Sequence, residues 1–298
     1  MFLGEKRADI INVMQRIKFS KGATNTMLSA FDNISSKYPE EFEELILRYK
    51  ARTDCDYDGI LNRVAEMGSE FGIHKYTSDI MVFLCFAEYL KDRYYENNID
   101  EGIFWETIAD LRYKMDDWFE RSGVYGTNTA KSFFGHFILL RFQFGRLQFE
   151  LETTKKDYIF NGKLIKAGTK IINTHIPRTG EGLLPEEVAK SFERAAEFYK
   201  DEFKDSPMYF TCFSWLLYPW NAEILKPDSN MVKFYNNFTI VDVIEDTSYS
   251  EVHNLFLCGY HGDVEVLPEN TTLERAYKER IRQGKPLGSG SGMFEYKK

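Results

Sequence analysis

One histidine and one cysteine stand near the ends of two successive β-type segments, where such side chains can carry acid-base or nucleophilic chemistry. His175 closes a segment from Thr169 to Pro177, and Cys212 lies in a later run from Met208 to Leu217. An imidazole with an ordinary pKa of about 6.5 suits a general base at neutral pH. A thiol beside an imidazole can form a covalent intermediate, because the thiolate is the nucleophile. The alternatives are a histidine hydrogen-bonded within a sheet and a cysteine packed in the core.

Three further side chains are candidates for moving protons. Glu150 ends the phrase Arg146-Leu147-Gln148-Phe149-Glu150 and is a second candidate base, with a solvated strand position or a partnership with Arg146 as the alternative. Tyr218 and Tyr235 follow the run that contains Cys212, where either phenol can protonate a leaving group. Aromatic residues around Tyr218 suit either an apolar pocket or an aromatic core.

A glycine loop joins the segment of His175 to a helix. The loop Arg178-Thr179-Gly180-Glu181-Gly182 is followed by a helix that begins at Pro185, a residue that suits the first helical position. Glycines allow close backbone approach, and the first turn of a helix has amide hydrogens without intrahelical partners, so this arrangement can bind an anion. Leu184 occupies the cap position and offers no capping oxygen. The carboxylates of Glu181, Glu186 and Glu187 would repel a bound anion. The alternative interpretation of the loop is a tight strand-to-helix turn.

These residues belong to a chain with two different patterns. Up to about residue 125, apolar residues recur at helical spacing, and two long helices are expected from about Ser78 to Asn97 and from about Asp100 to Glu120. After that point, β-type runs alternate with turns. The runs are 140–151, 157–165 around the hairpin signal Asn161-Gly162, 169–177, 208–217, 237–243 and 254–260.

The strand-helix-strand crossover between Thr169 and Leu217 should make its two strands parallel in a mostly antiparallel sheet. A short helix is expected at 221–225, and a last helix spans about Thr271 to Gln283, opened by the capping-box pattern Thr271-x-x-Glu274. The glycine-rich run 288–292 is interpreted as a flexible or close-packed tail. The pattern predicts an α+β protein with an all-helical N-terminal domain, residues 1–125, and a sheet domain, residues 126–298.

Composition excludes several classes of function. The 298 residues carry a net charge of -8, which disfavours nucleic acid and anionic membranes as partners. No apolar stretch reaches the roughly 20 residues of a membrane span, so a soluble, cytoplasmic protein is expected. The cysteines and the remaining histidines show no spacing typical of a metal site, and no metal is predicted. These residues are Cys55, Cys85, Cys212, Cys258, His74, His136, His253 and His261.

Several phrases resemble a bacterial acyltransferase family that joins a helical N-terminal domain to a GNAT-like C-terminal domain. The C-terminal phrases are Arg146 to Glu150, His175-Ile176-Pro177, Phe213 to Leu217 and Leu267 to Leu273, and the N-terminal ones are Asp79, Phe104-Trp105 and Ala109 to Lys114. The resemblance covers most of the chain. GNAT enzymes hold the pyrophosphate of acyl-coenzyme A on an Arg/Gln-x-x-Gly-x-Gly/Ala loop, and the loop here is one residue shorter. The residues that the resemblance assigns to coenzyme A are Ile176, Arg178, Thr179, Gly180, Gly182 and Leu183.

The resemblance implies an acyl-CoA-dependent N-acyltransferase whose acceptor is a small-molecule amine or a peptide. Direct transfer needs a base, an oxyanion donor and an acid, which the candidates above can provide in part. Two alternatives stay open. One is a non-catalytic binding module on a GNAT-like fold, and the other is a thiol-dependent acyltransferase or hydrolase that uses Cys212 and His175. The sequence leaves the acyl length, the acceptor, the oligomeric state and the choice of base undetermined.

Overall fold

The computed structural model describes residues 2–51, 56–249, 252–256 and 262–297. Cys55, Cys258 and His261 lie outside these ranges. The chain divides into two compact units, Met1–Gln143 with Arg178–Gly180, and Phe144–Pro177 with Glu181–Lys298. Within the described ranges, no helix is both long enough and apolar enough to cross a membrane.

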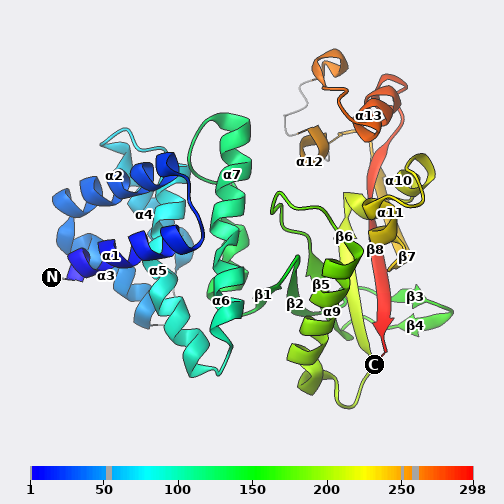
Figure 1. Ribbon diagram of the computed structural model, residues 1–298, viewed down its shortest axis with the longest axis horizontal. Helices are drawn as coiled ribbons and strands as arrows, with labels where there is room; N and C mark the ends of the chain where they lie inside the picture. The colour runs from blue at the N-terminus through cyan, green and yellow to red at the C-terminus, as the bar shows by residue number, and fades with distance from the viewer. Residues whose placement is uncertain (1, 52–55, 250–251, 257–261, 298) are drawn as a thin grey trace. The chain divides into compact units, whose positions relative to one another are not determined.

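The first unit is helical and is organised around α5 (Lys75–Glu96), as the sequence pattern predicts (Figure 1). This helix is buried along most of its length, and its middle, from Ile80 to Ala87, is continuously apolar and buried. Helices α1 to α4 and α6 pack against it. The other elements of this unit are α1 (Phe2–Arg16), α2 (Lys21–Lys37), α3 (Pro39–Ala51), α4 (Tyr57–Ser69), α6 (Glu101–Ile108), α7 (Asp110–Ser122), the 3-10 turn η1 (Ala130–Phe133) and α8 (Phe134–Phe137).

The prediction of one helix from Asp100 to Glu120 is wrong, because the helix is interrupted at Ala109, which separates α6 from α7. The residues beside the break make tertiary hydrogen bonds. Thr107 accepts a hydrogen bond from the backbone N–H of Gln143 at 2.9 Å, and the buried Asp110 carboxylate lies 3.3 Å from His136 Nε2. The spacing of apolar residues along one helix cannot predict such tertiary contacts.

The second unit contains a six-stranded sheet in the order β1-β2-β5-β6-β8-β7. Strands β5 and β6 are parallel, which confirms the predicted crossover, whereas β2 with β5, β6 with β8 and β7 with β8 are antiparallel. The α+β class and the mostly antiparallel sheet are therefore confirmed. The strands are β1 (Arg141–Phe144), β2 (Leu147–Thr153), β5 (Lys170–His175), β6 (Met208–Ser214), β7 (Thr239–Asp246) and β8 (Leu287–Tyr296).

The predicted Asn-Gly hairpin is confirmed as β3 (Tyr158–Phe160) and β4 (Lys163–Ile165). Asn161 and Gly162 have φ angles of 48° and 76°, the left-handed pair that a tight hairpin turn requires. This hairpin forms a separate two-stranded sheet.

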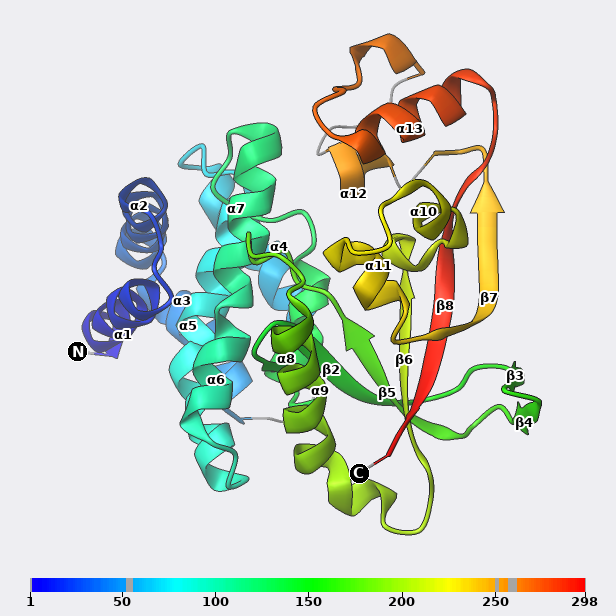
Figure 2. The ribbon, with the colours of Figure 1, turned by 45° about the vertical axis from the view of Figure 1, so that its right-hand side comes forward.

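Helix α9 (Pro185–Tyr199) covers one face of the large sheet (Figure 2). Its Phe192 ring packs edge-on against Phe149, Phe210 and Phe294, which come from three different strands. This aromatic cluster fixes which strand residues point toward α9 and, by alternation, which point away from it. The remaining elements are η2 (Lys200–Phe203), η3 (Trp215–Leu217), α10 (Pro219–Ile224), α11 (Asn230–Tyr235), α12 (Val252–Phe256), η4 (Val264–Val266) and α13 (Thr272–Arg282), which carries the predicted capping box.

In the C-terminal region one sequence prediction is wrong and another is correct in part. The run predicted as a strand from Asn254 to Tyr260 begins as helix α12, and its last residues lie outside the described ranges. The glycine-rich run 288–292, interpreted as a flexible or close-packed tail, is part of β8, a strand between β6 and β7, and it is close-packed rather than flexible. Close packing explains its composition: a Cβ on Gly290 would lie 2.1 Å from the Leu217 carbonyl oxygen, and one on Gly288 would lie 2.4 Å from that of Ile244.

Candidate active site

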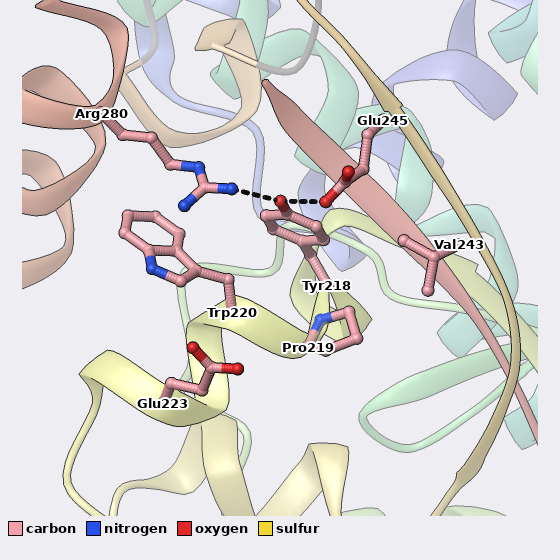
Figure 3. A pocket seen from close by; sticks show the side chains of 7 residues that line it. All are labelled: Tyr218, Pro219, Trp220, Glu223, Val243, Glu245 and Arg280. Atoms are coloured by element: carbon pink, nitrogen blue, oxygen red, sulfur yellow. Dashed lines mark hydrogen bonds between the residues drawn. The ribbon is translucent and has the colours of Figure 1, made fainter. Parts of the chain in front are cut away.

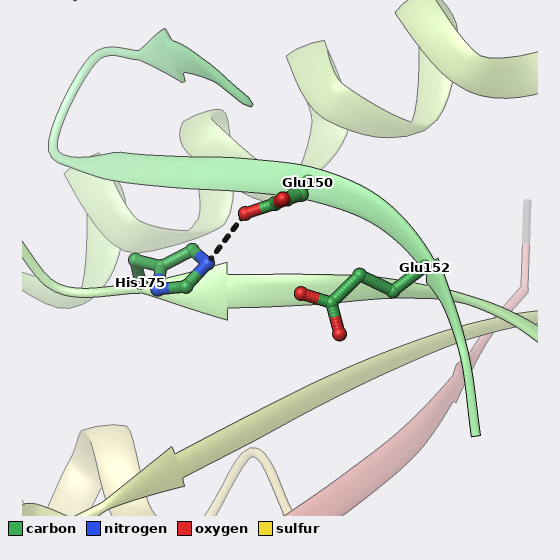
Figure 4. Close-up of side chains that lie close together, drawn as sticks. All are labelled: Glu150, Glu152 and His175. Carbon is green, nitrogen blue, oxygen red and sulfur yellow. Dashed lines mark ion pairs between the residues drawn. The ribbon is translucent and has the colours of Figure 1, made fainter. Parts of the chain in front are cut away.

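The structure brings together two of the candidate bases. His175 at the end of β5 and Glu150 on β2 point to the sheet face opposite α9, and His175 Nε2 lies 3.3 Å from Glu150 Oε2 (Figure 4). Their side chains are 30% and 13% exposed. A carboxylate at this distance orients an imidazole and stabilises its protonated form, as in other acid-base pairs. Glu150 is therefore a largely buried partner of His175 rather than a solvated strand residue.

Two more polar residues adjoin this pair on the same face. Glu152 follows Glu150 by two positions on β2, and its carboxylate accepts a hydrogen bond of 3.3 Å from Asn173 Nδ2. The same amide nitrogen lies 3.4 Å from His175 Nε2. Ligand atoms of Glu150, Glu152 and His175 all lie within 4.8 Å of one another. The cluster of these three residues was not predicted from the sequence, although the alternation Glu150-x-Glu152 places two carboxylates on one strand face.

Parallel pairing of β5 with β6 ends beside this cluster. The paired residues are Ile172 with Phe210 and Asn173 with Thr211, and β5 and β6 continue to His175 and Ser214 beyond them. A cavity of about 410 Å³ lies on this part of the sheet and is lined by Asn173 and Thr211, among others. Its volume lies within the usual range for small-molecule sites, about 300–1,000 Å³.

Cys212 does not lie beside His175. Thr211 shares a face with Asn173, so alternation directs Cys212 to the opposite face from His175, toward Phe210 and α9. The thiol is 2% exposed, and burial raises its pKa to about 12. The expectation of a neighbouring Cys-His pair is therefore wrong, and the position instead fits the alternative of a packed core cysteine.

Arg146 shapes the glycine loop. This residue is 8% exposed, and its guanidinium donates hydrogen bonds to the carbonyl oxygens of Pro177 at 2.8 Å, Glu181 at 3.1 Å and Gly182 at 3.2 Å. Its backbone N–H donates to Ser191 Oγ on α9. In the sequence, Arg146 was noted as part of a family phrase and as an alternative partner of Glu150, and its role in the loop was missed. The signal available was an arginine in a turn between two apolar strands.

The predicted coenzyme A residues all lie in the segment between β5 and α9. Gly180 has a φ of 82°, a conformation that favours glycine, and the cap position Leu184 provides no side-chain hydrogen bond, as the sequence predicts. Arg178 groups with the helical unit, where its guanidinium pairs with Asp117 at 2.5 Å and Glu120 at 3.2 Å of α7. The other candidates in this segment are Ile176, Thr179, Gly182 and Leu183.

Tyr218 lies on the other side of the sheet, in a separate cavity of about 560 Å³ (Figure 3). Its hydroxyl accepts a hydrogen bond of 2.8 Å from Arg280 and donates to Glu245. Burial raises the pKa of Tyr218 to about 12. Tyr235, at the end of α11, also has its pKa raised by burial and by the charge of Glu223. Neither tyrosine is placed with the His175–Glu150 pair.

The fold and these residues define an acyltransferase with a helical N-terminal part and a GNAT-like C-terminal part. Residues 8–137 match the N-acyltransferase N-terminal domain, and residues 141–294 match the GNAT-like C-terminal domain. The chain therefore belongs to this N-acyltransferase family. No curated protein matches the sequence at a significant level.

Solved acyltransferases share the fold. One is a mutant acyltransferase in complex with octanoyl-CoA, at 21% identity and a TM-score of 0.75 over 97% of this chain and 88% of that chain. Another is an acyltransferase in complex with decanoyl-CoA and teicoplanin, at 22% identity and a TM-score of 0.73 over 95% of this chain and 86% of that chain.

Proposed function

We propose that this protein is an acyl-CoA-dependent N-acyltransferase in which the sheet domain binds the donor. Membership of the N-acyltransferase family supports the reaction class. The octanoyl-CoA and decanoyl-CoA complexes of similar structures support acyl-CoA as the donor, and the teicoplanin complex supports a small-molecule acceptor.

The loop that follows β5 is the proposed donor site. Arg146 holds three carbonyl oxygens of this segment, and α9 begins without a side-chain cap. Amide groups of the segment from Ile176 to Leu183 then provide hydrogen bonds for the pyrophosphate of coenzyme A. Arg178 contributes less than the family pattern implies, because Asp117 and Glu120 already neutralise it.

The proposed chemistry is direct transfer. The amine nitrogen attacks the thioester carbon, the C–N bond forms, and the C–S bond breaks in the collapse of the tetrahedral intermediate. The amine proton passes to His175, and the carboxylate of Glu150 stabilises the resulting imidazolium. The departing thiolate of coenzyme A takes a proton from water, since Tyr218 is engaged by Arg280 and Glu245 and Tyr235 is not placed with the His175–Glu150 pair.

One observation carries this proposal: His175 Nε2 lies 3.3 Å from Glu150 Oε2 where the pairing of β5 with β6 ends. A general base of this type contributes about 10²- to 10⁴-fold to the rate. A covalent thiol mechanism lacks this support, because Cys212 points away from His175.

The test is release of free coenzyme A from octanoyl-CoA in the presence of primary amines, measured with a thiol reagent. His175→Ala should lower kcat by 100-fold or more, and Glu150→Gln by about tenfold, with the KM for octanoyl-CoA little changed. His74→Asn is the matched control, since His74 caps the start of α5, a position where asparagine is also a good cap. Absence of octanoyl-CoA binding at millimolar concentration would favour a non-catalytic binding module, and full activity of His175→Ala would exclude the proposed base.

A further inference from the structure

The cavity beside the candidate base lies entirely within the sheet unit, on the face opposite α9. Residues of β2, β5, β6, β7 and β8 and of the β3–β4 segment line its 410 Å³. Asn173 connects this cavity to the base, since its amide nitrogen contacts both Glu152 and His175. The part of a bound molecule that contacts Asn173 would therefore lie near the His175–Glu150 pair.

The charged groups of the cavity are Glu152, Asp242, Lys155 and Lys156. Lys156 neutralises Asp242 at 2.5 Å, and this lysine lowers the pKa of the Asp242 carboxyl. Glu152 differs from Asp242, because its hydrogen bond comes from the neutral amide of Asn173 and no lysine or arginine of the described ranges forms an ion pair with it. The carboxylate of Glu152 thus lies between the base and the cavity and can bind a cation.

The same cavity has an apolar part. Phe213 and Ile244 line it, and each is 55% exposed, which is high for such large apolar residues. Phe213 lies on β6 just beyond the last residue that pairs with β5, on the same face as Thr211. Covering these two side chains with an apolar ligand would remove their surface from water, which is favourable by about 25 cal/mol per Å².

We propose that this cavity is the acceptor site, that Glu152 selects the acceptor as an alkylammonium ion, and that Phe213 and Ile244 bind an apolar body attached to it. The acceptor class is a primary aralkyl amine, rather than a highly hydroxylated amine or an amino acid. Glu152 is a specificity-determining residue that attracts the cation. The bound ammonium loses one proton to water, and the neutral amine then attacks the thioester and passes its second proton to His175. This inference rests on the proposed transferase function.

The test compares 2-phenylethylamine, glucosamine and phenylalanine as acceptors with octanoyl-CoA. The KM for 2-phenylethylamine should be at least tenfold below that for glucosamine, and phenylalanine should be poorer because its carboxylate faces Glu152. Glu152→Gln should raise the KM for 2-phenylethylamine about tenfold, with kcat within threefold and the KM for octanoyl-CoA unchanged. Phe213→Ala should raise the KM for 2-phenylethylamine and leave that for glucosamine unchanged. Glu193→Gln, on the exposed side of α9, is the control variant.

The two proposals fail in different ways. Lack of octanoyl-CoA binding and of coenzyme A release refutes the transferase function itself. Transfer that prefers glucosamine, or that is unaffected by Glu152→Gln, refutes only the assigned acceptor class. If octanoyl-CoA binds and no amine reacts, titration of 2-phenylethylamine followed by NMR tests the acceptor site. An affinity for 2-phenylethylamine that is the same in Glu152→Gln and in the unaltered protein also overturns the inference.

Discussion

Replacement of Arg146 by methionine should disorder the glycine loop and weaken acyl-CoA binding. The guanidinium makes three hydrogen bonds to loop carbonyl oxygens. At about 1 kcal/mol net for each bond, the ordered loop conformation loses about 3 kcal/mol relative to its alternatives. Since 1.4 kcal/mol corresponds to a factor of ten, the competent conformation becomes about 100-fold less populated if no other contact compensates. Methionine retains most of the buried side-chain volume, so the change removes mainly these bonds.

Calorimetry with octanoyl-CoA measures the effect, and we expect a loss in affinity of tenfold to 100-fold. Hydrogen exchange of amides from Ile176 to Leu183 should accelerate in the same variant. Arg178→Met is the matched control, because that guanidinium pairs with α7, and its affinity should change by less than threefold. A folded Arg146→Met protein with affinity within twofold of the unaltered protein would refute the assigned role. Arg146→Lys keeps the charge, so its affinity for octanoyl-CoA should lie between that of Arg146→Met and that of the unaltered protein.

Four further predictions concern Asp79, Gly290, Cys212 and the removal of metal ions. Burial raises the pKa of Asp79 to about 6, so the folded state favours its protonated form; its stabilising contribution is present below about pH 4 and is lost as pH rises through 6. Asp79→Asn should remove that loss, up to about 3 kcal/mol at pH 7 in denaturant unfolding. Gly290→Ala should cost about 3 kcal/mol in the same assay, whereas Gly4→Ala, with nothing within 4 Å, should not destabilise. Cys212→Ala should retain kcat within threefold, and a loss above 100-fold would restore the thiol mechanism. Dialysis against EDTA should leave transferase activity unchanged, and a loss reversed by a metal ion would contradict the predicted absence of a metal.

Local sequence signals were sufficient where the structure depends on local geometry. Asn161-Gly162 specified a hairpin because its two φ angles are positive, and Thr271 with Glu274 specified the start of α13. The apolar spacing of α9 also specified its buried face, and the length of chain between the two flanking strands required a parallel crossover. The hairpin, the capping box and the buried face of α9 each depend on residues close together in sequence, and the crossover follows from the order of strand, helix and strand.

Local sequence signals gave wrong or incomplete predictions where contacts between distant parts of the chain determine the structure. Strand β8 has glycines where a strand usually has β-branched residues, and only the approach of Leu217 and Ile244 explains them. The sequence identified His175 and Glu150 as separate candidates, but it could not give the register that joins them. The same register placed Cys212 on the opposite face. Arg146 was missed as a loop-organising residue because its three acceptors lie more than 30 positions away.

The position of β8 has a consequence for synthesis on the ribosome. In the sheet, β7 pairs with β8 alone, and β8 follows every other strand of the unit in the chain. While the nascent chain grows, β6 and β7 therefore each present an edge that has no strand to pair with it. Such edges are prone to association with other chains. Release of residues 287–296 from the ribosomal tunnel is thus the step that completes the sheet, so a ribosome paused before it should hold a protein that needs chaperones.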